Sequence, residues 1–484
     1  MKRLNYLLVL PVLIGMLIMS CTKDDIIDES PSIKLFFSED TLLFDTVFST
    51  VGTATQVFKI YNPSENKIRI SSIKLGRGSS SPYRFNVDGL ASTEVKDLEI
   101  DGKDSAFVFV KVTIDPGNIN SPFIQQDSLV FETNTNVQDV KLIAWGQDAY
   151  FYNRAIIGSD YVFEADKPHV IYNYLIVDSS FTLEVLAGAK IYLHPGAFIL
   201  VYNSASLKVK GTAENPVTFE GDRLEDYYKT LSGQWNRIWL YAGSVNNEIE
   251  YAIIKNGQVG IQVDTVGNST NPTLKMSNTT ITNMEGIGLL AQGSKVEAAN
   301  CVIANCGSYS VTLSLGGSYD FRHCTIGNYW TRFQKTSGLL LNNYYVDTAD
   351  NRQNRPLEKA YFGNCVIYGE NDEEITLDPS PDNVNFNYTF DHCLLKTKLD
   401  INDPAHYINS IKNQEPWFMD PTVGNYEPDS TLSSVINKGS IEIINSANGF
   451  DLTKDILQRN RTLDEAPDLG AYEFQVPEKR KFRK

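Results

Sequence analysis

The chain has 484 residues, enough for two or three domains with a substantial core. Its 25 tyrosines and 24 phenylalanines exclude a globally disordered chain. The net charge is −16, and losing the two charges of Lys2 and Arg3 would make it −18, so the chain lacks the positive footprint of a nucleic-acid-binding protein.

Residues 1–20 have the composition of a targeting segment. Lys2 and Arg3 precede an apolar run from Leu7 to Met19, which is short for a membrane span and typical of a secretory signal. Cys21 follows Ser20 at the end of this run. A cysteine after a small residue at this place resembles a bacterial lipobox, which implies that Cys21 is lipidated and becomes the mature N-terminus. An ordinary buried or free cysteine is the alternative.

The residues just after Cys21 bear on localisation. Lys23-Asp24-Asp25 resembles the acidic signal that sends some Gram-negative lipoproteins to the outer surface. We therefore expect a protein anchored in outer-membrane lipid through Cys21 and facing the cell exterior; a lipid tethers without spanning. Residues 21–32 are acidic and polar, and Thr22 to Pro31 are predicted to form a mobile linker.

Residues 33–147 alternate short strand-like runs with turn signals such as Asn62-Pro63. The runs include 57–62, 107–112 and 128–133. About seven such strands in this length favour a β-sandwich. The strand ending in Asn-Pro and the terminal Leu142–Gly146 resemble the immunoglobulin-like domains of the ASPM/SPD-2/Hydin type. We expect a spacer or docking module whose protein partner the sequence does not identify.

From about residue 150 the alternation continues in stretches split by glycine turns, as in 183–193 and 205–219. These stretches look like the first coils of bacterial β-helix proteins. Gly221–Tyr228 is an insertion between coils, with charged and aromatic residues that suit a groove; an exposed loop is the alternative.

One short pattern then recurs six times. The copies are Tyr251–Asn256, Asn278–Asn283, Asn300–Asn305, His323–Asn328, Asn364–Gly369 and His392–Thr397. Their second positions are 27, 22, 23, 41 and 28 residues apart, and a period of this size indicates a solenoid. Apolar and polar residues alternate with period 2 within each copy, which predicts a strand. A strand, a turn and another strand would make one coil.

Aligned positions of the repeat hold similar residues. The second column is small, the fourth is Ile or Leu, and the sixth begins with Asn256, Asn283, Asn305 and Asn328. Stacked coils would bury such columns, and each Asn amide can hydrogen-bond its equivalent one coil away. This asparagine ladder resembles the right-handed parallel β-helix proteins, the pectate-lyase-like solenoids. The expected fold is all-β, with an N-terminal Ig-like β-sandwich followed by a right-handed parallel β-helix over residues 150–474.

Five cysteines follow Cys21: Cys301, Cys306, Cys324, Cys365 and Cys393. All but Cys306 occupy the inward second column, where a free thiol packs well. Adjacent coils lie about 4.8 Å apart, close to the Cα separation of a disulfide, but directly stacked residues rarely reach its torsion. We expect free buried thiols and leave Cys306 open. No C-x-x-C pair exists, and His323 and His392 face away from the cysteines, so no metal site is expected.

The chain past the last coil resembles the C-terminal end, sometimes labelled choice-of-anchor Q, that closes such β-helices. An open last coil would expose unpaired strand edges, which is why solenoids carry caps. The resemblance implies that Trp417, Asn437 and Asp468 are structural. Residues 475–484 are expected to form a solvated basic tail.

Polysaccharide-cleaving β-helices carry their site on the outer face of one sheet. Here Lys275, Glu297 and Asp320 fall in one outward column and Arg322 in the next, a sparse version of a catalytic set. A lyase needs carboxylates, usually with calcium, and a Lys or Arg base; a hydrolase needs two carboxylates about 5 to 9.5 Å apart. The alternative, which we favour, is a solvated face where opposite charges on neighbouring strands attract.

Binding is therefore the predicted function, with carbohydrate as the ligand. The candidate contacts are outward aromatic residues: Tyr329, Trp330, Tyr344, Tyr345 and Tyr361. The first four lie in the 41-residue repeat, and long loops on a rigid solenoid gather binding residues. Packing of Trp330 and Tyr344 against the β-helix is the alternative. The prediction is a non-catalytic surface lipoprotein without cofactor, and the rival is a lyase or glycoside hydrolase, with calcium if a lyase.

Overall fold

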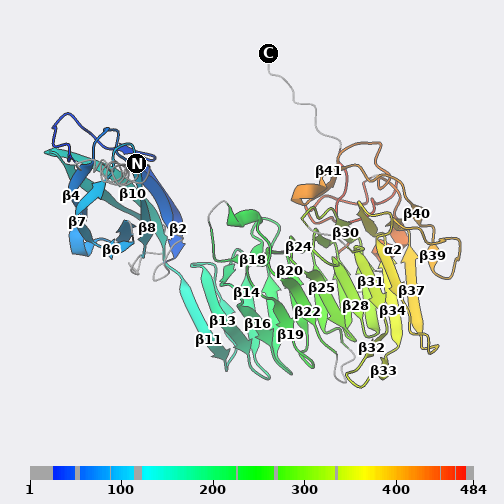
Figure 1. Ribbon diagram of the computed structural model, residues 1–484. Coiled ribbons are helices and arrows are strands. Elements are labelled where there is room, and N and C mark those ends of the chain that lie inside the picture. Colours follow the sequence, from blue (N-terminus) through cyan, green and yellow to red (C-terminus); the bar gives the residue numbers. More distant parts are fainter. Residues whose placement is uncertain are drawn as a thin grey trace, which may run out of the picture. The chain divides into compact units, whose positions relative to one another are not determined.

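The computed structural model describes residues 26–48, 55–87, 89–113, 123–224, 227–265, 271–332, 336–446, 449–463 and 465–475. Cys21, the leader and the tail from residue 476 lie outside the described residues. The chain divides into two compact units, Met1–Asp148 and Ala149–Lys484, and both are built almost wholly from strands (Figure 1). Among the described residues, no helix is long and apolar enough to cross a membrane.

The first unit is a sandwich of two five-stranded sheets, with strand orders β1-β3-β8-β5-β6 and β2-β10-β9-β4-β7. The elements are β1 (Phe36–Phe37), β2 (Thr41–Phe48), β3 (Gln56–Tyr61), β4 (Ile68–Leu75), η1 (Gly78–Ser80), β5 (Tyr83–Val87), β6 (Leu90–Ser92), β7 (Glu94–Ile100), β8 (Ser105–Val112), β9 (Phe123–Thr133) and β10 (Asn136–Gln147). Inward residues such as Phe58, Tyr83 and Phe131 fill its core. There are ten strands rather than about seven, because edge strands as short as β1 and β6 are too brief to show an alternating pattern.

The segment before the sandwich corrects the prediction of a mobile linker. Three amide side chains hold it along the β9–β10 hairpin from Asp28 to Leu35. Asn134 Nδ2 donates to the carbonyl of Asp28 at 2.8 Å, and Asn136 Nδ2 donates to that of Pro31 at 2.8 Å. Gln138 accepts from the backbone N–H of Leu35 at 2.8 Å and donates to its carbonyl at 2.9 Å. We call this arrangement the amide clip.

The second unit is a parallel β-helix with three strand ladders, which run side by side in Figure 1. The first ladder contains β12 (Tyr161–Phe163), β14 (Thr182–Leu186), β17 (Ser206–Lys210), β20 (Asn247–Glu250), β23 (Leu274–Ser277), β26 (Lys295–Ala299), β29 (Gly317–Arg322), β34 (Leu357–Gly363), β37 (Phe386–Asp391) and β39 (Tyr407–Ile408). The second contains β15 (Lys190–Leu193), β18 (Val217–Gly221), β21 (Ala252–Lys255), β24 (Thr280–Thr282), β27 (Val302–Ala304), β30 (Thr325–Asn328), β35 (Val366–Gly369), β38 (Leu394–Leu395) and β40 (Ile411–Lys412).

The third ladder contains β16 (Phe198–Val201), β19 (Ile238–Leu240), β22 (Val259–Val263), β25 (Ile287–Gln292), β28 (Val311–Ser314), β31 (Leu339–Asn342) and β36 (Ile375–Asp378), while the strands β11 (Tyr150–Ile157) and β13 (His169–Val177) begin the helix. A complete coil thus has three strands, one more than the repeat alone indicates. The remaining elements are the hairpin β32 (Tyr344–Val346) and β33 (Arg352–Asn354), the pair β41 (Phe418–Asp420) and β42 (Asn425–Pro428), and the short helices η2 (Tyr228–Thr230), η3 (Pro421–Val423) and α2 (Ile441–Asn445).

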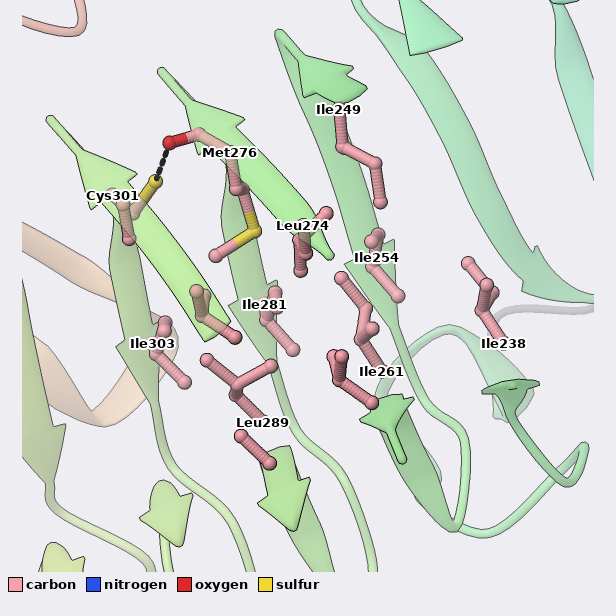
Figure 2. Close-up of a cluster of buried hydrophobic side chains, with 14 of the residues drawn as sticks. Ile238, Ile249, Ile254, Ile261, Leu274, Met276, Ile281, Leu289, Cys301 and Ile303 are labelled. Carbon is pink, nitrogen blue, oxygen red and sulfur yellow. Dashed lines mark hydrogen bonds between the residues drawn. The ribbon is translucent and has the colours of Figure 1, made fainter. Parts of the chain in front are cut away.

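The strand register confirms the columns of the repeat. Ile254 pairs with Ile281, which pairs with Ile303, and the column continues to Leu395. These side chains point into the coil, where they meet inward residues of the other two ladders (Figure 2). Each coil buries its inward side chains against those of the neighbouring coils, and this stacking forms the core.

The cysteine column is buried, as the sequence predicts. Cys301, Cys306, Cys324, Cys365 and Cys393 are all free thiols in the interior. Their Sγ atoms donate to backbone carbonyls, for example Cys301 to Ala299 at 3.1 Å and, more weakly, to Met276 (Figure 2). Cys306, outside the column, is likewise buried and free.

The asparagine ladder forms only in part. Asn283 Nδ2 donates to Asn256 Oδ1 at 2.7 Å, which is the predicted rung. Asn305 and Asn328 instead donate to the carbonyl of Pro421 and to Glu374 Oε2, both at 2.7 Å. Because these two amides bond to other segments of the chain instead of to each other, the ladder has only the rung between Asn283 and Asn256 in this column.

A second polar ladder, at the first position of each copy, was not anticipated. These residues have left-handed φ values between 47° and 53°: Tyr251, Asn278, Asn300, His323, Asn364 and His392. Asn300 Nδ2 donates to Asn278 Oδ1 at 3.2 Å, and Asn364 Nδ2 donates to His323 Nε2 at 3.0 Å. Asn and His are enriched in left-handed backbone, so this column of the sequence carried the signal.

Residues 415–475 do not simply close the last coil. They form what we call the C-terminal layer, which lies against the side of the β-helix and reaches back as far as Tyr251, whose hydroxyl contacts Gln458. Apolar residues of the layer, such as Tyr426 and Leu469, pack against outward residues of the second ladder. In Figure 1 the segment with β41 and α2 lies beside the coils that carry β30 and β37.

The three cap residues named from the sequence differ in their surroundings. Asp468 is buried and accepts from the N–H groups of Asn437 at 2.7 Å and Phe474 at 2.6 Å. Trp417 has a left-handed φ of 47° and is 51% exposed. At the last coil itself, Leu399 and Ile401 pack against the core.

Candidate functional site

The predicted catalytic column exists as a row on the first ladder. Lys275 pairs with Glu297, Glu297 with Asp320, and Asp320 with Tyr361. Ala299 pairs with Arg322 in the neighbouring column. The register was therefore predicted correctly, but the surroundings of the row were not.

Asp320 and Arg322 are not on a solvated face, because the C-terminal layer covers them. They are 5% and 7% exposed and form an ion pair at 2.8 Å, and Lys359 binds the second oxygen of Asp320 at 2.7 Å. Arg322 Nη1 donates to the carbonyl of Ile443 at 3.1 Å and to that of Ser446 at 2.7 Å, at the end of α2.

The ionisation of this pair suits a structural role. Burial opposes charge on Asp320, but hydrogen bonds from Arg322 and Lys359 outweigh it and lower the pKa of the carboxyl. A general acid would need a raised pKa. The arrangement fixes α2 to the β-helix.

His323, which the sequence placed on the outer surface, is fully buried beneath the same layer. Its Nε2 accepts the hydrogen bond from Asn364, which requires a neutral ring at that nitrogen. Burial, with the nearby Arg461, holds the pKa of His323 well below its usual value.

Lys275 lies in a separate cleft of about 270 Å³ between the first ladder and the loop 449–451. Its Nζ donates to the carbonyl of Gly449 at 3.3 Å and lies 4.5 Å from the Phe450 ring. Glu248, Glu250 and Asp451 also line this loop cleft, whereas Glu297 is not among its lining residues. Of the four catalytic candidates, only Lys275 lies in this cleft. Its acidic neighbours there were not among the candidates selected from the sequence.

The five aromatic candidates fall in three places. Tyr344 and Tyr345 belong to the hairpin strand β32, where Tyr344 donates to Asp378 Oδ1 at 3.1 Å and Tyr345 is 39% exposed. Tyr361 is on the first ladder and donates to Asp391 Oδ2 at 2.9 Å. Tyr329 and Trp330 lie together at a turn of the helix, with Trp330 only 4% exposed.

Tyr329 and Trp330 line a groove of about 350 Å³ that we call the turn groove. Its lining comes from η2, from turns of the β-helix, from residues 329–332 and from η3 and the glycine that follows it. The lining residues are Lys229, Thr230, Lys255, Asn256, Thr282, Asn283, Asn305, Tyr329, Trp330, Thr331, Arg332, Thr422, Val423 and Gly424.

The asparagines of the partial ladder anchor the walls of the turn groove. Asn256 Nδ2 donates to the carbonyl of Lys229 at 3.0 Å, and Asn283 Nδ2 to that of Thr230 at 2.8 Å. Asn305 holds the opposite wall through its bond to Pro421, and its Oδ1 accepts from the hydroxyl of Tyr426 at 2.6 Å. Walls from two distant stretches of the sequence, residues 229–230 and 421–426, are thus fixed to one row of amides, which preorganises the groove.

The chemistry of the turn groove is polar and cationic. Lys229, Lys255 and Arg332 line it together with four threonines and three asparagines, and among the residues that the structure describes no aspartate or glutamate does so. Arg332 bridges two walls, with Nη2 donating to the carbonyl of Thr230 at 2.5 Å. Lys255 is partly neutralised, since its Nζ lies 2.9 Å from Glu220.

The sequence pointed to some of this groove. Tyr329 and Trp330 were candidates and line it, whereas the insertion 221–228, noted as a possible groove wall, contributes none of its described lining residues, the nearest of which are Lys229 and Thr230. The contribution of η3 was missed, because it depends on the C-terminal layer. A signal existed: the outward positions Val302, Ala304 and Val366 of the second ladder are apolar and fully buried, which predicts that something covers them.

No family model and no curated protein matches the chain. Among solved structures it is similar to the catalytic unit of a GH87 α-1,3-glucanase from Streptomyces thermodiastaticus, with 12% identity over 74% of this chain and 66% of that one and a TM-score of 0.25. A GH87 catalytic domain in complex with nigerose has 11% identity over 75% and 88%, with a TM-score of 0.20. The chain is also similar to a PapD-like domain of human CEP192, with 10% identity over 25% of this chain and 89% of that one, and a TM-score of 0.17.

The chain spans only 31% of a family 123 glycoside hydrolase from Clostridium perfringens that it also matches, with 7% identity over 28% of this chain and a TM-score of 0.20. Scores of this size are too low to transfer an activity.

Proposed function

We propose that the protein is a surface lipoprotein, anchored through Cys21 in the outer membrane, whose β-helix binds carbohydrate without cleaving it. The sandwich is a spacer or docking module between anchor and β-helix. The turn groove is the binding site, and Tyr329 and Trp330 are the aromatic residues of the predicted set that take part.

The observation that supports this proposal is the composition of the turn groove. Its hydroxyls, amides and cations offer many hydrogen bonds to sugar hydroxyls, and the half-buried Tyr329, backed by the buried Trp330, adds apolar surface. The walls are already fixed by Asn256, Asn283 and Asn305, so little ordering is needed on binding. A glycosidase requires a pair of carboxylates. The described lining of the turn groove contains none.

The second candidate is cleavage of an acidic glycan in the loop cleft. Lys275 there would be the base, and its three acidic neighbours, Glu248, Glu250 and Asp451, would neutralise a uronate only together with a bound cation such as calcium. One of those acids is already engaged, because Glu248 forms an ion pair with Lys208 at 2.8 Å.

The test uses soluble protein that starts at Thr22, together with immobilised neutral and acidic polysaccharides, with and without calcium. Retention of the protein and release of reducing or unsaturated ends are both measured. We expect retention without turnover. Thr282→Trp, at an outward position on the groove floor, should abolish retention by filling the groove, while Thr218→Trp, outward on β18 and outside the groove, should not.

Turnover that disappears in Lys275→Met but persists in Thr282→Trp would replace the binding proposal with the second candidate. Retention that survives Thr282→Trp unchanged would place the site elsewhere and refute the turn groove.

A further inference from the structure

We infer that one outer face of the sandwich binds the surface of an anionic membrane. The face belongs to the sheet β1-β3-β8-β5-β6 and consists of the outward side chains of β1, β3, β5 and β8, which alternate with the inward residues of the core. We call it the aromatic face. This role goes beyond the proposed binding of carbohydrate, which concerns the β-helix.

Four large apolar side chains are exposed on the aromatic face. Phe36, Val57, Phe107 and Phe109 are between 43% and 64% exposed. Val57 and Phe109 pair in neighbouring strands, and the rings of Phe107 and Phe109 stack with their centroids 6.2 Å apart. Three of the four thus form one continuous patch. A large exposed apolar patch marks a surface that contacts a protein or a membrane.

Three cations lie among these apolar side chains. Lys111 pairs with Arg84 in the neighbouring strand, and like charges directly opposite each other destabilise a strand pair. Arg84 Nη1 donates to two backbone carbonyls, at 2.7 and 2.6 Å, which leaves the charge of its guanidinium unpaired. Lys59 Nζ lies 4.5 Å from the centre of the Phe107 ring. Among the described residues, no carboxylate forms an ion pair with any of the three.

The outer face of the other sheet, β2-β10-β9-β4-β7, shows the opposite arrangement. Outward cations there have a carboxylate partner at 2.5 to 2.8 Å, in the pairs Arg69–Glu99, Lys74–Glu132 and Lys141–Asp139. The two faces of one small domain therefore differ in whether positive charge is neutralised within the domain. On the aromatic face the charge is left for an anionic partner, although the whole chain carries a net charge of −16.

A hollow of about 800 Å³ adjoins Phe109 on the aromatic face. Arg84, Asn86 and Lys111 line it together with that ring, and its described lining contains no aspartate or glutamate. Arginine and lysine suit phosphate oxygens, and an aromatic ring beside them suits the apolar part of a lipid. The hollow thus fits the headgroup of an anionic phospholipid.

Two considerations favour a membrane over a protein as the occupant. Exposed Phe side chains enter the boundary between headgroups and acyl chains, while neighbouring Lys and Arg side chains meet anionic headgroups. On the proposed anchoring at Cys21, the sandwich is also the unit next to the lipid along the chain, since the clipped segment begins at Asp28. The aromatic face would then add a second membrane contact to that of the lipid.

The experiment measures co-sedimentation of the soluble chain from Thr22, which lacks Cys21, with two kinds of vesicle. One kind is phosphatidylcholine alone, and the other contains about a third phosphatidylglycerol, whose headgroup is anionic. We expect at least about tenfold tighter binding to the anionic vesicles, with weakening as salt rises from about 50 to 300 mM. Because this chain carries no lipid, the result does not depend on acylation of Cys21.

The matched charge variants are R84M/K111M on the aromatic face and R69M/K74M on the other sheet. Each removes one arginine and one lysine, so both change the net charge equally. The first should weaken binding to anionic vesicles by about tenfold or more, and the second should change it by less than about twofold.

A third variant, F107T/F109T, tests the apolar contribution. It should also weaken vesicle binding by about tenfold or more, because it removes the rings that enter the membrane, while Thr keeps the strand preference of the sequence. Thermal melting of all three variants checks that the sandwich is folded. Retention on polysaccharide should be unchanged in each, so failure of the proposed carbohydrate function is read out separately.

Several outcomes would overturn the inference. These are no binding to either vesicle, equal binding to both, or binding to anionic vesicles that R84M/K111M and F107T/F109T leave unchanged. Binding of soluble polyglutamate that R84M/K111M abolishes, without vesicle binding, would also overturn it and assign the aromatic face to an acidic protein partner.

Discussion

The coils that the C-terminal layer covers differ from the uncovered coils in their outward residues. On the second ladder, the outward residues Thr218 and Glu220 of β18 are half-buried and polar. Those of β27 and β35 are fully or almost fully buried, as at Val302, Val366 and Tyr368. The inward column is apolar and buried in both regions, with Phe219 in β18 and Ile303 and Ile367 in β27 and β35, and the larger difference lies in what meets the outer face.

The comparison shows that the repeat determines which side chains fill the interior of the coils. It does not determine what packs on their outer face. Where the outward positions become apolar, the C-terminal layer covers them and buries charged groups such as Arg461 and Asp320. Both candidate clefts lie where the layer meets bare coils. The four predictions that follow test the comparison, beginning with the variant that should disturb it most.

Arg461→Met should detach the C-terminal layer. Arg461 is fully buried, and its guanidinium binds Glu473 at 3.2 Å, the carbonyl of Gly470 at 3.0 Å and Asn300 at 3.2 Å. Its loss removes the buried cation that faces the Glu473 carboxylate, whose Oε2 would keep the N–H of Asp468 at 3.1 Å, and should cost about 3–5 kcal/mol. Denaturant unfolding measures the loss, and hydrogen exchange should rise within residues 449–475.

The matched control is Arg352→Met, which removes the exposed ion pair with Asp382 and should cost less than about 1 kcal/mol. If Arg461→Met unfolds no more easily than this control, the layer is not a cooperative part of the fold.

Gly327→Val should have the next largest effect. A side chain at Gly327 would collide with the ring of Tyr426, which packs over it from the layer. Overpacking of this kind costs about 1–3 kcal/mol. Thr282→Val is the control, because Thr282 occupies the same column but faces the turn groove rather than a ring packed against it. A melting temperature equal for both variants would contradict the close contact between layer and coil.

His323→Asn should change the pH dependence of stability. The folded pKa of His323 is far below its unfolded value of about 6.5, so the unfolded chain binds more protons as the medium becomes acidic. Its stabilising contribution is complete above about pH 6.5 and is lost as the pH falls. Asn occupies the same left-handed position in Asn278, Asn300 and Asn364, so the variant keeps the backbone.

Thermal melting at pH 5 and pH 7.5 checks this prediction. The unmodified protein should lose more stability on acidification than His323→Asn does. Identical losses would mean that His323 is already accessible to protons in the folded state, and therefore that the layer does not seal it.

Tyr345→Ala should have the smallest effect. Tyr345 is 39% exposed, on a hairpin away from the turn groove, with Arg355 5.9 Å from its ring. We expect a change in stability below about 0.5 kcal/mol and unchanged retention on polysaccharide. Loss of retention would show that the hairpin belongs to the binding site after all.

The repeat made the fold predictable. The C-terminal layer, which covers part of the β-helix, made the site hard to predict. Columns such as Ile254–Ile281–Ile303 are visible in sequence because like residues stack at fixed spacing. The exposure of Asp320 and His323 was wrong because it depends on α2 and residues 455–474, which lie more than a hundred residues away. Trp330 and Tyr329 were found because they are aromatic residues in a long insertion, whereas Lys229 and Thr422 join them only through the fold.

The amide clip has a consequence for reach. On the proposed anchoring at Cys21, residues 21–27 separate the lipid from the clipped segment, and seven residues span at most about 25 Å. Unclipping residues 28–35 would add eight residues and roughly 29 Å. The amide clip therefore sets the length of chain between Cys21 and the sandwich. That length limits how far the sandwich can move from the proposed anchor. On the proposed anchoring, so short a connection would keep the sandwich close to the membrane surface.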